Sequence, residues 1–334
     1  MKLKFLKISL VFFLLAGSIG LAYAWGSWGH KHISRSAVFA LPDSMRTFFY
    51  NHIDFITEGA VVPDLRKYVI NDKVEGPRHY VDIEDFGNLP ISSFPKTTKE
   101  AYTKYDSAFL NKTGYLPWYI QNMTYKLTEA FKKKNKSEII FIAAELSHYI
   151  ADAHMPLHTS SNHDGQLTGQ KGVHALWESL LPQMFGNDYN FKVAPAVYIN
   201  DITAETWRII EQSHSLVEPL LKIEMQVRKS FPKDNMYKKD AEGNLIKSFN
   251  APVYSDEYAQ HFHTALNGMV EQQLRLSITD VANFWYTAWV NGGSPNLTSL
   301  DDPNLTKQNR KNFKRELKAW NKGKLLNLSF DKGD

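Results

Sequence analysis

Cysteine is absent from the 334 residues of this sequence. The absence excludes disulfide bonds, thiol catalysis and zinc sites built from thiolates, so a bound metal would need imidazole, carboxylate or backbone ligands. Disorder is excluded for most of the chain, because aromatic residues make up 13% of it and unfoldable chains contain few of them. The length allows one large domain or two small ones and suffices to bury a core.

A strong excess of one charge sign is also absent from the central region. Residues 25–300 hold 27 basic and 30 acidic side chains, because the first 24 residues hold three lysines and the last 34 hold nine basic and five acidic side chains. The formal charge of +4 for the full chain therefore misrepresents this region. Duplex-specific DNA binding, which requires a broad basic face, is not indicated.

Long apolar runs are missing except at the N-terminus. A lysine-containing start is followed by apolar residues 8–22 and then by Ala22-Tyr23-Ala24, the pattern of a secretory signal with a small-x-small cleavage site. The run is shorter than the ~20 residues that a membrane-spanning helix needs. We expect residues 1–24 to be a signal peptide, the mature protein to be periplasmic or secreted, and no transmembrane segment to remain after cleavage.

Strand patterns are scarce and helical patterns are common. They predict helices over residues 31–40, 42–51, 116–134, 137–154, 200–230 and 256–291, with a surface loop over 232–252. The sequence therefore predicts an all-α fold with a single multi-helix domain over residues 25–295. A basic C-terminal extension follows over residues 296–334, which we interpret as a short helix and a solvated appendage.

Residues able to bind a metal are concentrated in four places. Two of these places contain pairs four residues apart, which share one face of a helix, and a proline break lets the chain turn after the first pair. The four sets are His148 and Asp152 with His158; His174 and Glu178; Asp64 and His79; and Trp25 with His30. Imidazole and carboxylate ligands in a cysteine-free chain favour zinc.

The predicted new N-terminus adds an unusual ligand. Once Ala24 is removed, the free amine of Trp25 and its own carbonyl oxygen can form a five-membered chelate around a cation. Signal cleavage would then be a step in building the metal site.

These positions together resemble the zinc-dependent phospholipase C and single-strand-specific nuclease superfamily, helical enzymes with a trinuclear zinc cluster. The resemblance extends from Trp25 to about Gly293, and the residues named above match the ligands of that cluster in order. It implies a domain built around three Zn²⁺ ions. Three groups of ligands are implied: Asp64, His79, His148 and Asp152; the Trp25 amine and carbonyl with His30 and Asp152; and His158, His174 and Glu178.

The same resemblance implies that Asp64 is the catalytic residue that orients or deprotonates the attacking water. The third group would keep open positions for water and substrate. Two zinc ions bridged by Asp152 would lower the pKa of a water molecule between them towards neutrality. The flanking Arg66 and Arg78 could pair with a substrate phosphate or form surface salt bridges.

Features of both branches of the superfamily are present. Glu178 and the short loop between His158 and His174 favour a phospholipase C, whereas the spacing from Trp25 to His30 and the His-Met-Pro-Leu-His run are nuclease-like. Aromatic side chains could stack on single-stranded bases, although core packing is the ordinary role of Trp28, Trp118 and Trp177.

We therefore expect a secreted zinc-dependent phosphodiester hydrolase of phospholipase C type. The alternatives are a single-strand-specific nuclease and, in a different class, an exported zinc-binding protein without catalysis. Phospholipid or single-stranded nucleic acid would be the substrate, and the sequence indicates no obligate protein partner. The other histidines are interpreted as structural or solvated, with His154 as a possible partner of a ligand.

Overall fold

The structure is a computed structural model that describes residues 26–87, 90–248 and 251–326. The predicted signal peptide, residues 1–24, and Trp25 lie outside the described residues. Within the described part of the chain, no helix combines the length and the apolar character needed to cross a membrane.

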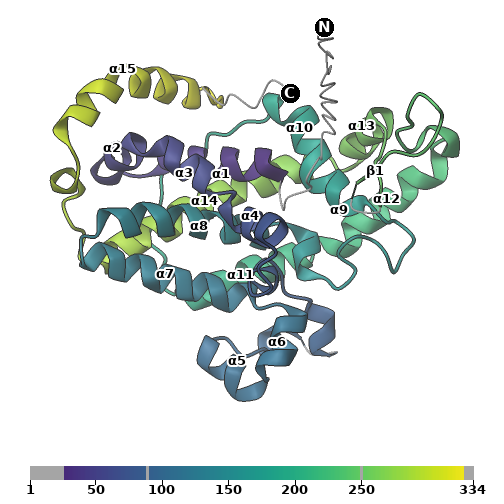
Figure 1. The fold of residues 1–334 in the computed structure, drawn as a ribbon, viewed down its shortest axis with the longest axis horizontal. Coiled ribbons are helices and arrows are strands. Elements are labelled where there is room, and N and C mark those ends of the chain that lie inside the picture. Colours follow the sequence, from purple (N-terminus) through teal and green to yellow (C-terminus); the bar gives the residue numbers. More distant parts are fainter. Residues whose placement is uncertain (1–25, 88–89, 249–250, 327–334) are drawn as a thin grey trace, which may run out of the picture.

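Helices dominate the described residues, as the sequence predicts (Figure 1). The α-helices are α1 Gly26–Ala40, α2 Asp43–Asn51, α3 Ile53–Gly59, α4 Val62–Leu65, α5 Thr98–Lys104, α6 Ser107–Thr113, α7 Leu116–Lys132, α8 Lys136–Ala153, α9 Val173–Ala175, α10 Leu181–Phe185, α11 Ile202–His214, α12 Val217–Ser230, α13 Asp256–Ala265, α14 Met269–Asn291 and α15 Pro303–Trp320. Two π-helical segments are η1 Arg66–Ile70 and η6 Leu176–Leu180. The 3₁₀ segments are η2 Gly76–Arg78, η3 Ile83–Phe86, η4 Ile91–Ser93, η5 Pro156–Thr159, η7 Gly186–Asp188, η8 Lys233–Asn235 and η9 Leu297–Leu300.

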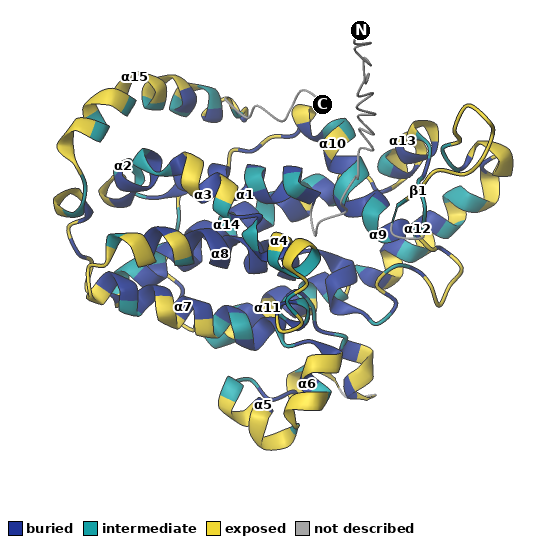
Figure 2. Ribbon diagram, viewed as in Figure 1, coloured by how far each residue is buried: buried dark blue, intermediate teal, exposed yellow. Residues whose placement is uncertain are grey.

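Helix α8 runs through the middle of the molecule, between α1, α3, α7 and α14 (Figures 1 and 2). Its residues 143–153 are all buried, as expected for a helix that is covered on every side. Small residues allow the close packing: a Cβ added to Gly59 of α3 would lie 2.9 Å from the Cβ of Ala144. Glycine at position 59 therefore lets α3 approach α8, which brings the following segment, residues 60–64, close to the centre.

The predicted helix boundaries are accurate where the signals are local. The predictions over 116–134 and 137–154 correspond to α7 and α8, and the Asn135 side chain caps α8 by accepting a hydrogen bond from the backbone of Glu138. The helix predicted over 31–40 begins earlier, at Gly26. Tertiary packing explains the longer helix, because most of its added first turn is buried.

Two predicted long helices are wrong, because each is divided. The helix predicted over 200–230 breaks between His214 and Val217, and Pro219 stands in the first turn of α12, where a missing N–H is tolerated. The helix predicted over 256–291 breaks between α13 and α14, where Gly268 adopts a left-handed conformation with φ of 84°.

The region 232–252, predicted as a surface loop, contains a small antiparallel sheet. Strands β1 Lys247–Ser248 and β2 Ala251–Pro252 pair Lys247 with Pro252 and Ser248 with Ala251. Most described residues between 233 and 247 are exposed, as expected for a surface segment.

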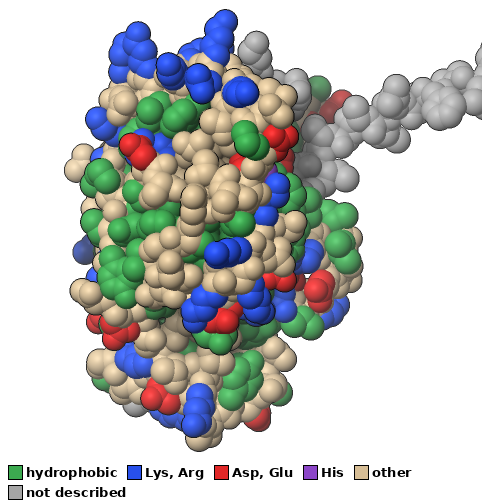
Figure 3. Space-filling model, turned by 90° about the vertical axis from the view of Figure 1, so that its left-hand side faces the viewer, with side chains coloured by type: hydrophobic (Ala, Val, Ile, Leu, Met, Phe, Trp, Pro, Cys, Tyr) green, Lys and Arg blue, Asp and Glu red, His purple; other side chains and the backbone are tan. Residues whose placement is uncertain are grey.

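The predicted C-terminal helix, α15, packs against the domain instead of extending into solvent as an appendage. Its buried Glu316 pairs with Arg35 of α1 at 2.7 Å and accepts a hydrogen bond from the hydroxyl of Tyr50 at 2.8 Å, while Trp320 is 6% exposed. The expectation of a solvated appendage is therefore wrong for this helix. Its outer face remains basic, and Figure 3 shows Lys and Arg side chains gathered along the top, where α15 runs.

Candidate metal centre

Helix α8 supplies the central pair of the candidate site. His148 and Asp152 lie one turn apart and are fully buried, with Nε2 of His148 3.2 Å from Oδ2 of Asp152. The spacing of four residues places both side chains on one face of the helix. That face is directed towards the segments that carry the other candidate ligands.

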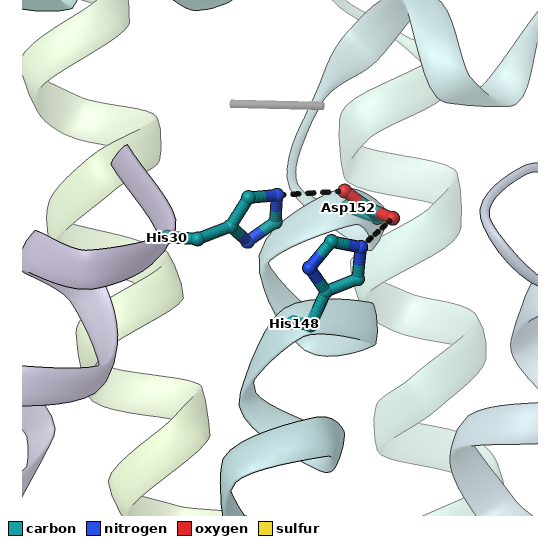
Figure 4. Close-up of side chains that lie close together, drawn as sticks. All are labelled: His30, His148 and Asp152. Carbon is teal, nitrogen blue, oxygen red and sulfur yellow. Dashed lines mark ion pairs between the residues drawn. The ribbon is translucent and has the colours of Figure 1, made fainter. Parts of the chain in front are cut away.

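Helix α1 adds His30 to this pair (Figure 4). The His30 ring stacks on the His148 ring with centroids 3.8 Å apart, and its Nε2 lies 3.5 Å from Oδ1 of Asp152. His30 and His148 thus face different oxygens of Asp152. One carboxylate arranged in this way can serve two cations at once.

Asp64 and His79 approach the same carboxylate from a separate segment. Asp64 lies in α4, and His79 follows η2. Nδ1 of His79 lies 3.0 Å from Oδ2 of Asp152 and 3.7 Å from Oδ1 of Asp64. Donor atoms of Asp64, His79 and His148 all lie within 4.8 Å of one another, close enough to hold one ion.

His158, His174 and Glu178 form the third group. Oε2 of Glu178 lies 3.1 Å from Nε2 of His174 and 3.7 Å from Nε2 of His158. The proline break after α8 turns the chain, so that Nδ1 of His158 lies 3.6 Å from Oδ1 of Asp152. The third group is therefore adjacent to the other two.

The structure thus brings together every sequence-predicted ligand that it describes. These residues form three groups that could hold metal ions: His30, His148 and Asp152; Asp64, His79 and His148; and His158, His174 and Glu178. Trp25, predicted as the ninth ligand, lies outside the described residues.

Hydrogen bonds on the outer side of the imidazoles fix which nitrogen faces the centre. Nδ1 of His148 donates to the carbonyl of Ala60 at 2.7 Å, and Nδ1 of His174 donates to the carbonyl of His163 at 2.9 Å. Each bond leaves the Nε2 lone pair directed into the site. Contacts of this kind orient metal-binding histidines in many proteins.

A buried glutamate, Glu75, was not predicted as part of the site. Its Oε1 lies 3.4 Å from Nε2 of His79, and it accepts hydrogen bonds from Arg66, Arg78 and Tyr149. Burial would raise the pKa of Glu75, but hydrogen bonds from His79, Arg66 and Tyr149 hold it well below its usual range. Its position four residues before His79 is the sequence signal that could have identified it.

Arg66 and Arg78 therefore have structural partners, as the salt-bridge alternative expected. Arg66 also pairs with Glu145 and donates to the hydroxyl of Tyr149. Both guanidinium groups are directed towards buried carboxylates, and neither arginine is among the described residues that line the cavity at the site.

Three carboxylate oxygens of Asp64 and Asp152 lack, within the described part of the chain, the hydrogen-bond donors that buried carboxylates normally have. Among the described residues, both oxygens of Asp64 and Oδ1 of Asp152 accept no hydrogen bond although they are buried. Burial, together with the charge of Asp152, raises the pKa of Asp64 well above its ordinary value, and burial raises the pKa of Asp152 to about 6. Two crowded, buried carboxylates, three of whose four oxygens lack a hydrogen-bond donor in the described structure, fit a site that holds cations.

The imidazoles support the same conclusion. Burial lowers the pKa of His148 to about 3, so the ring is neutral near pH 7, and its single proton is committed to the Ala60 carbonyl. Its Nε2 lone pair then lies 3.2 Å from Oδ2 of Asp152, and Nδ1 of His79, 3.0 Å from both atoms, can supply at most one proton to the two. Two acceptors in contact repel each other, whereas a divalent cation among them would attract both. The residues present therefore fit zinc.

A cavity of about 600 Å³ opens beside the third group. His79, His158, His174 and Glu178 line it, whereas the deeper Asp64, His148 and Asp152 do not. Charged side chains also line it, namely Lys67, Asp82, Lys112 and Asp164. The cavity is large enough for part of a phospholipid or for a nucleotide.

Lys67 is a second site residue that sequence reasoning missed. Burial would lower its pKa, but the neighbouring Tyr68 and Asp64 more than offset that effect, so the pKa of Lys67 lies above its ordinary value. The side chain is therefore a cation that lines the cavity. Its position three residues after Asp64, on the same helix face, is the available sequence signal.

The other histidines and tryptophans considered in the sequence have different placements. His154 pairs with Asp280 at 2.9 Å, so its partner is not one of the candidate ligands. His163, expected to be structural or solvated, lines the cavity. Trp28, Trp118 and Trp177 are at most 6% exposed and pack in the core, in agreement with their ordinary role.

A protein-family model matches a large part of this chain. The model described as zinc dependent phospholipase C matches residues 29–218, more than half of the sequence. This range begins in α1, ends at the start of α12, and contains each candidate ligand from His30 to Glu178. No curated protein matches the chain.

Proposed function

The chain belongs to the zinc-dependent phospholipase C family, whose members are phosphodiesterase hydrolases, and we propose that it hydrolyses the headgroup phosphodiester bond of phospholipids with three zinc ions as cofactors. The main support is that three buried groups of imidazoles and carboxylates converge, one of them lining a cavity of about 600 Å³. Closed structural zinc sites normally use four protein ligands, whereas His158, His174 and Glu178 supply three and leave room for substrate.

We assign the ligands to the ions in the three groups that the family resemblance of the sequence implies. Asp64, His79, His148 and Asp152 would hold one zinc, and His158, His174 and Glu178 another. Trp25, His30 and the second oxygen of Asp152 would hold the remaining ion. Zinc ions held in this way supply a Lewis acid for a phosphoryl oxygen and lower the pKa of water.

The protein's own side chains would orient the substrate and move the proton. Asp64 is our candidate to orient the attacking water and accept its proton, because its two oxygens accept no hydrogen bond from the described residues. Lys67 would place an ammonium charge beside the phosphate in the cavity. Glu75 would hold the imidazole of His79 in one orientation.

The burial of three tryptophans favours phospholipid over nucleic acid, although Tyr68 and Tyr80 line the cavity. The tryptophans that could have stacked on bases, Trp28, Trp118 and Trp177, are buried, and stacking provides much of the affinity for single strands. A nuclease remains the second candidate function, because Lys67 and Lys112 in the cavity would also attract the phosphates of a single strand.

A parallel assay of the zinc-loaded mature protein on phosphatidylcholine and on single-stranded DNA tests this proposal. We expect hydrolysis of phosphatidylcholine, lost after chelation and strongly reduced in His174→Ala, a candidate ligand. His261→Ala, which changes an exposed histidine outside the three groups, should retain wild-type activity. Hydrolysis of DNA but not of the lipid would instead establish the nuclease function.

We also propose that the protein is exported and that removal of residues 1–24 makes Trp25 a zinc ligand. The pattern of the N-terminal sequence supports the export. The position of the first described residue supports the ligand: a Cβ at Gly26 would lie 3.1 Å from Oγ of Ser179, the neighbour of Glu178. The start of α1 therefore lies beside the candidate site.

An N-terminal extension tests the role of Trp25. A protein that retains one residue before Trp25 has a planar, non-basic peptide nitrogen in place of the amine, and it should bind one zinc fewer and lose most activity. Zinc content and phosphodiesterase rate are compared with those of the correctly processed protein. Equal zinc content and equal rates would exclude Trp25 as a ligand.

A further inference from the structure

Four aliphatic side chains project into solvent next to the candidate metal centre. Leu65, Val69, Ile70 and Val74, which we name the apolar ridge, are 37%, 64%, 71% and 54% exposed. Single exposed apolar residues are common, but four within ten residues of sequence, at a functional cavity, require an explanation.

The segment that carries the ridge is held firmly at its base. Nε of Arg66 donates to buried Glu75 at 2.8 Å, and the backbone N–H of Asp72 donates to the carbonyl of Arg66 at 3.0 Å. The Asp72 side chain accepts from the backbone of Val74 at 3.0 Å. The apolar side chains are therefore displayed by an ordered turn, and little further entropy is lost when they contact a partner.

The ridge residues flank two cavity-lining residues in the sequence. It occupies the stretch between the candidate ligands Asp64 and His79, and the intervening Lys67 and Tyr68 line the cavity. A surface in contact with the ridge would therefore lie directly beside the reaction centre. This proximity matters for an enzyme whose substrate is held in a membrane.

We propose that the apolar ridge seats the protein on the surface of a phospholipid bilayer, an inference that rests on the proposed phospholipase function. Its aliphatic side chains would enter the boundary between headgroups and acyl chains. Exposed Lys73, at the tip of the same segment, would pair with lipid phosphates. The bound lipid headgroup would then face Lys67 in the cavity.

The chemistry of the ridge favours a bilayer over the other occupants. Leucine, valine and isoleucine have no aromatic face on which a base could stack, so a single-stranded nucleic acid would gain little from them. A second copy of the chain would need about 800 Å² on each partner for a stable interface, and four side chains on a narrow turn provide less. A bilayer accepts a small apolar projection without needing a complementary shape.

Vesicle binding by a ridge variant tests the inference. Val69→Ser/Ile70→Ser removes the two most exposed ridge side chains, and Tyr125→Ser/Val197→Ser removes two comparably exposed apolar side chains (66% and 60%) from other parts of the surface. Binding is measured by sedimentation with vesicles of the phosphonate analogue of phosphatidylcholine, whose headgroup linkage resists hydrolysis. The ridge variant should bind at least tenfold more weakly than wild type, and the control variant should bind like wild type.

Activity on a soluble substrate and on vesicles distinguishes an effect on membrane binding from an effect on catalysis. The ridge variant should hydrolyse soluble bis(p-nitrophenyl) phosphate like wild type and lose activity on phosphatidylcholine vesicles, with an unchanged urea unfolding curve. Equal vesicle binding by the two variants, or an equal loss of activity on single-stranded DNA, would overturn the inference. A wild-type dimer that becomes monomeric in the ridge variant would overturn it in favour of a subunit interface.

A failure of the inference about the ridge can be distinguished from a failure of the proposed function. If wild-type protein fails to hydrolyse phosphatidylcholine, the proposed function is wrong, whereas binding to the phosphonate vesicles still reports on the ridge. If it hydrolyses the lipid but vesicle binding does not depend on Val69 and Ile70, only the inference about the ridge is wrong.

Discussion

Among single residues, Asp152 is the one on which the candidate metal centre most depends. Its two oxygens face His30 on one side and His79 and His148 on the other. It is also fully buried, so no water from bulk solvent can readily replace it. A change at this position should therefore affect two metal ions.

Replacement of Asp152 by asparagine should remove about two of the three proposed zinc ions, because an amide is a poor zinc ligand and cannot bridge two cations. Elemental analysis of the purified protein measures the loss. Asp280→Asn provides a matched control, because Asp280 is a buried aspartate that contacts a histidine, His154, outside the three groups. An unchanged zinc content in Asp152→Asn would contradict the assignment of a shared carboxylate.

Asp82 should give substrate binding a dependence on pH. Burial, followed by the charges of Asp85 and Glu84, raises the pKa of this cavity residue to about 7. The carboxyl group is therefore mostly neutral below about pH 7 and negatively charged above it, where it repels an anionic phosphodiester. The KM for bis(p-nitrophenyl) phosphate should rise severalfold between about pH 6 and about pH 8.

The asparagine variant isolates the contribution of Asp82. In Asp82→Asn the rise in KM should disappear, because the side chain can no longer acquire a charge. Exposed Asp188→Asn, which is not a described residue of the cavity lining, should keep the wild-type profile. A profile in Asp82→Asn that matches wild type would assign the titration to another group.

At the scale of single residues, the sequence predicts the candidate ligands better than their surroundings. Pairs such as His174 and Glu178 can be recognised because four residues make about one helical turn. The roles of Glu75 and Lys67 depend instead on the direction in which the turn between Asp64 and His79 folds. That direction is set by contacts with distant residues such as Glu145 and Tyr149.

Among the elements, α15 shows the largest difference from the sequence-based expectation. The amphipathic pattern predicts a helix, but it does not reveal what the apolar face covers. The helix docks on α1, where Arg35 pairs with Glu316 of α15, and these two residues are 281 positions apart in the sequence. The boundaries of α7 and α8 could be predicted because they have local signals, Pro117 in the first turn of α7 and the Asn135 cap of α8, whereas a contact between distant segments has none.

Loss of the Glu316 carboxylate should destabilise the fold. Arg35 is 3% exposed and has one buried partner, Glu316, and one exposed partner, Asp54. Glu316→Ala leaves a buried guanidinium without its buried counter-charge and should lower the free energy of unfolding by about 3 kcal/mol. Asp54→Ala removes the partner that is 89% exposed and should cost less than about 1 kcal/mol.

Urea unfolding of the two variants, followed by circular dichroism, measures this difference. Both substitutions remove a carboxylate from the same arginine, so the comparison isolates the effect of burial. Equal losses of stability would mean that α15 contributes little through this contact.

For the whole molecule, the proposed metal ions connect segments that are far apart in the sequence. The candidate ligands come from α1, α4, α8, α9 and η6 and from the stretches that follow η2 and α8. A ligand that binds only the native state stabilises it, and this chain has no disulfide bond for the purpose. The stability of the folded protein should therefore depend strongly on zinc.

Chelation should lower the melting temperature by on the order of 10 °C, as expected if the ions contribute a few kcal/mol to a protein of this size. Differential scanning calorimetry before and after chelation measures the shift, and added zinc should restore the original value. The Asp152→Asn protein should show a smaller shift, because it has fewer ions to lose. An unchanged melting temperature with confirmed loss of zinc would place the ions at the periphery.

The contact between α1 and α15 has a consequence for biosynthesis. A ribosome releases α1 long before α15, so the guanidinium of Arg35 reaches its buried partner only after Glu316, 281 residues later, has been made. Arg35 lies five residues after His30 on the same helix, so this late step completes the packing of a segment that carries a proposed ligand. We therefore expect the helix that carries His30 to reach its final packing only after α15 has been made and has docked.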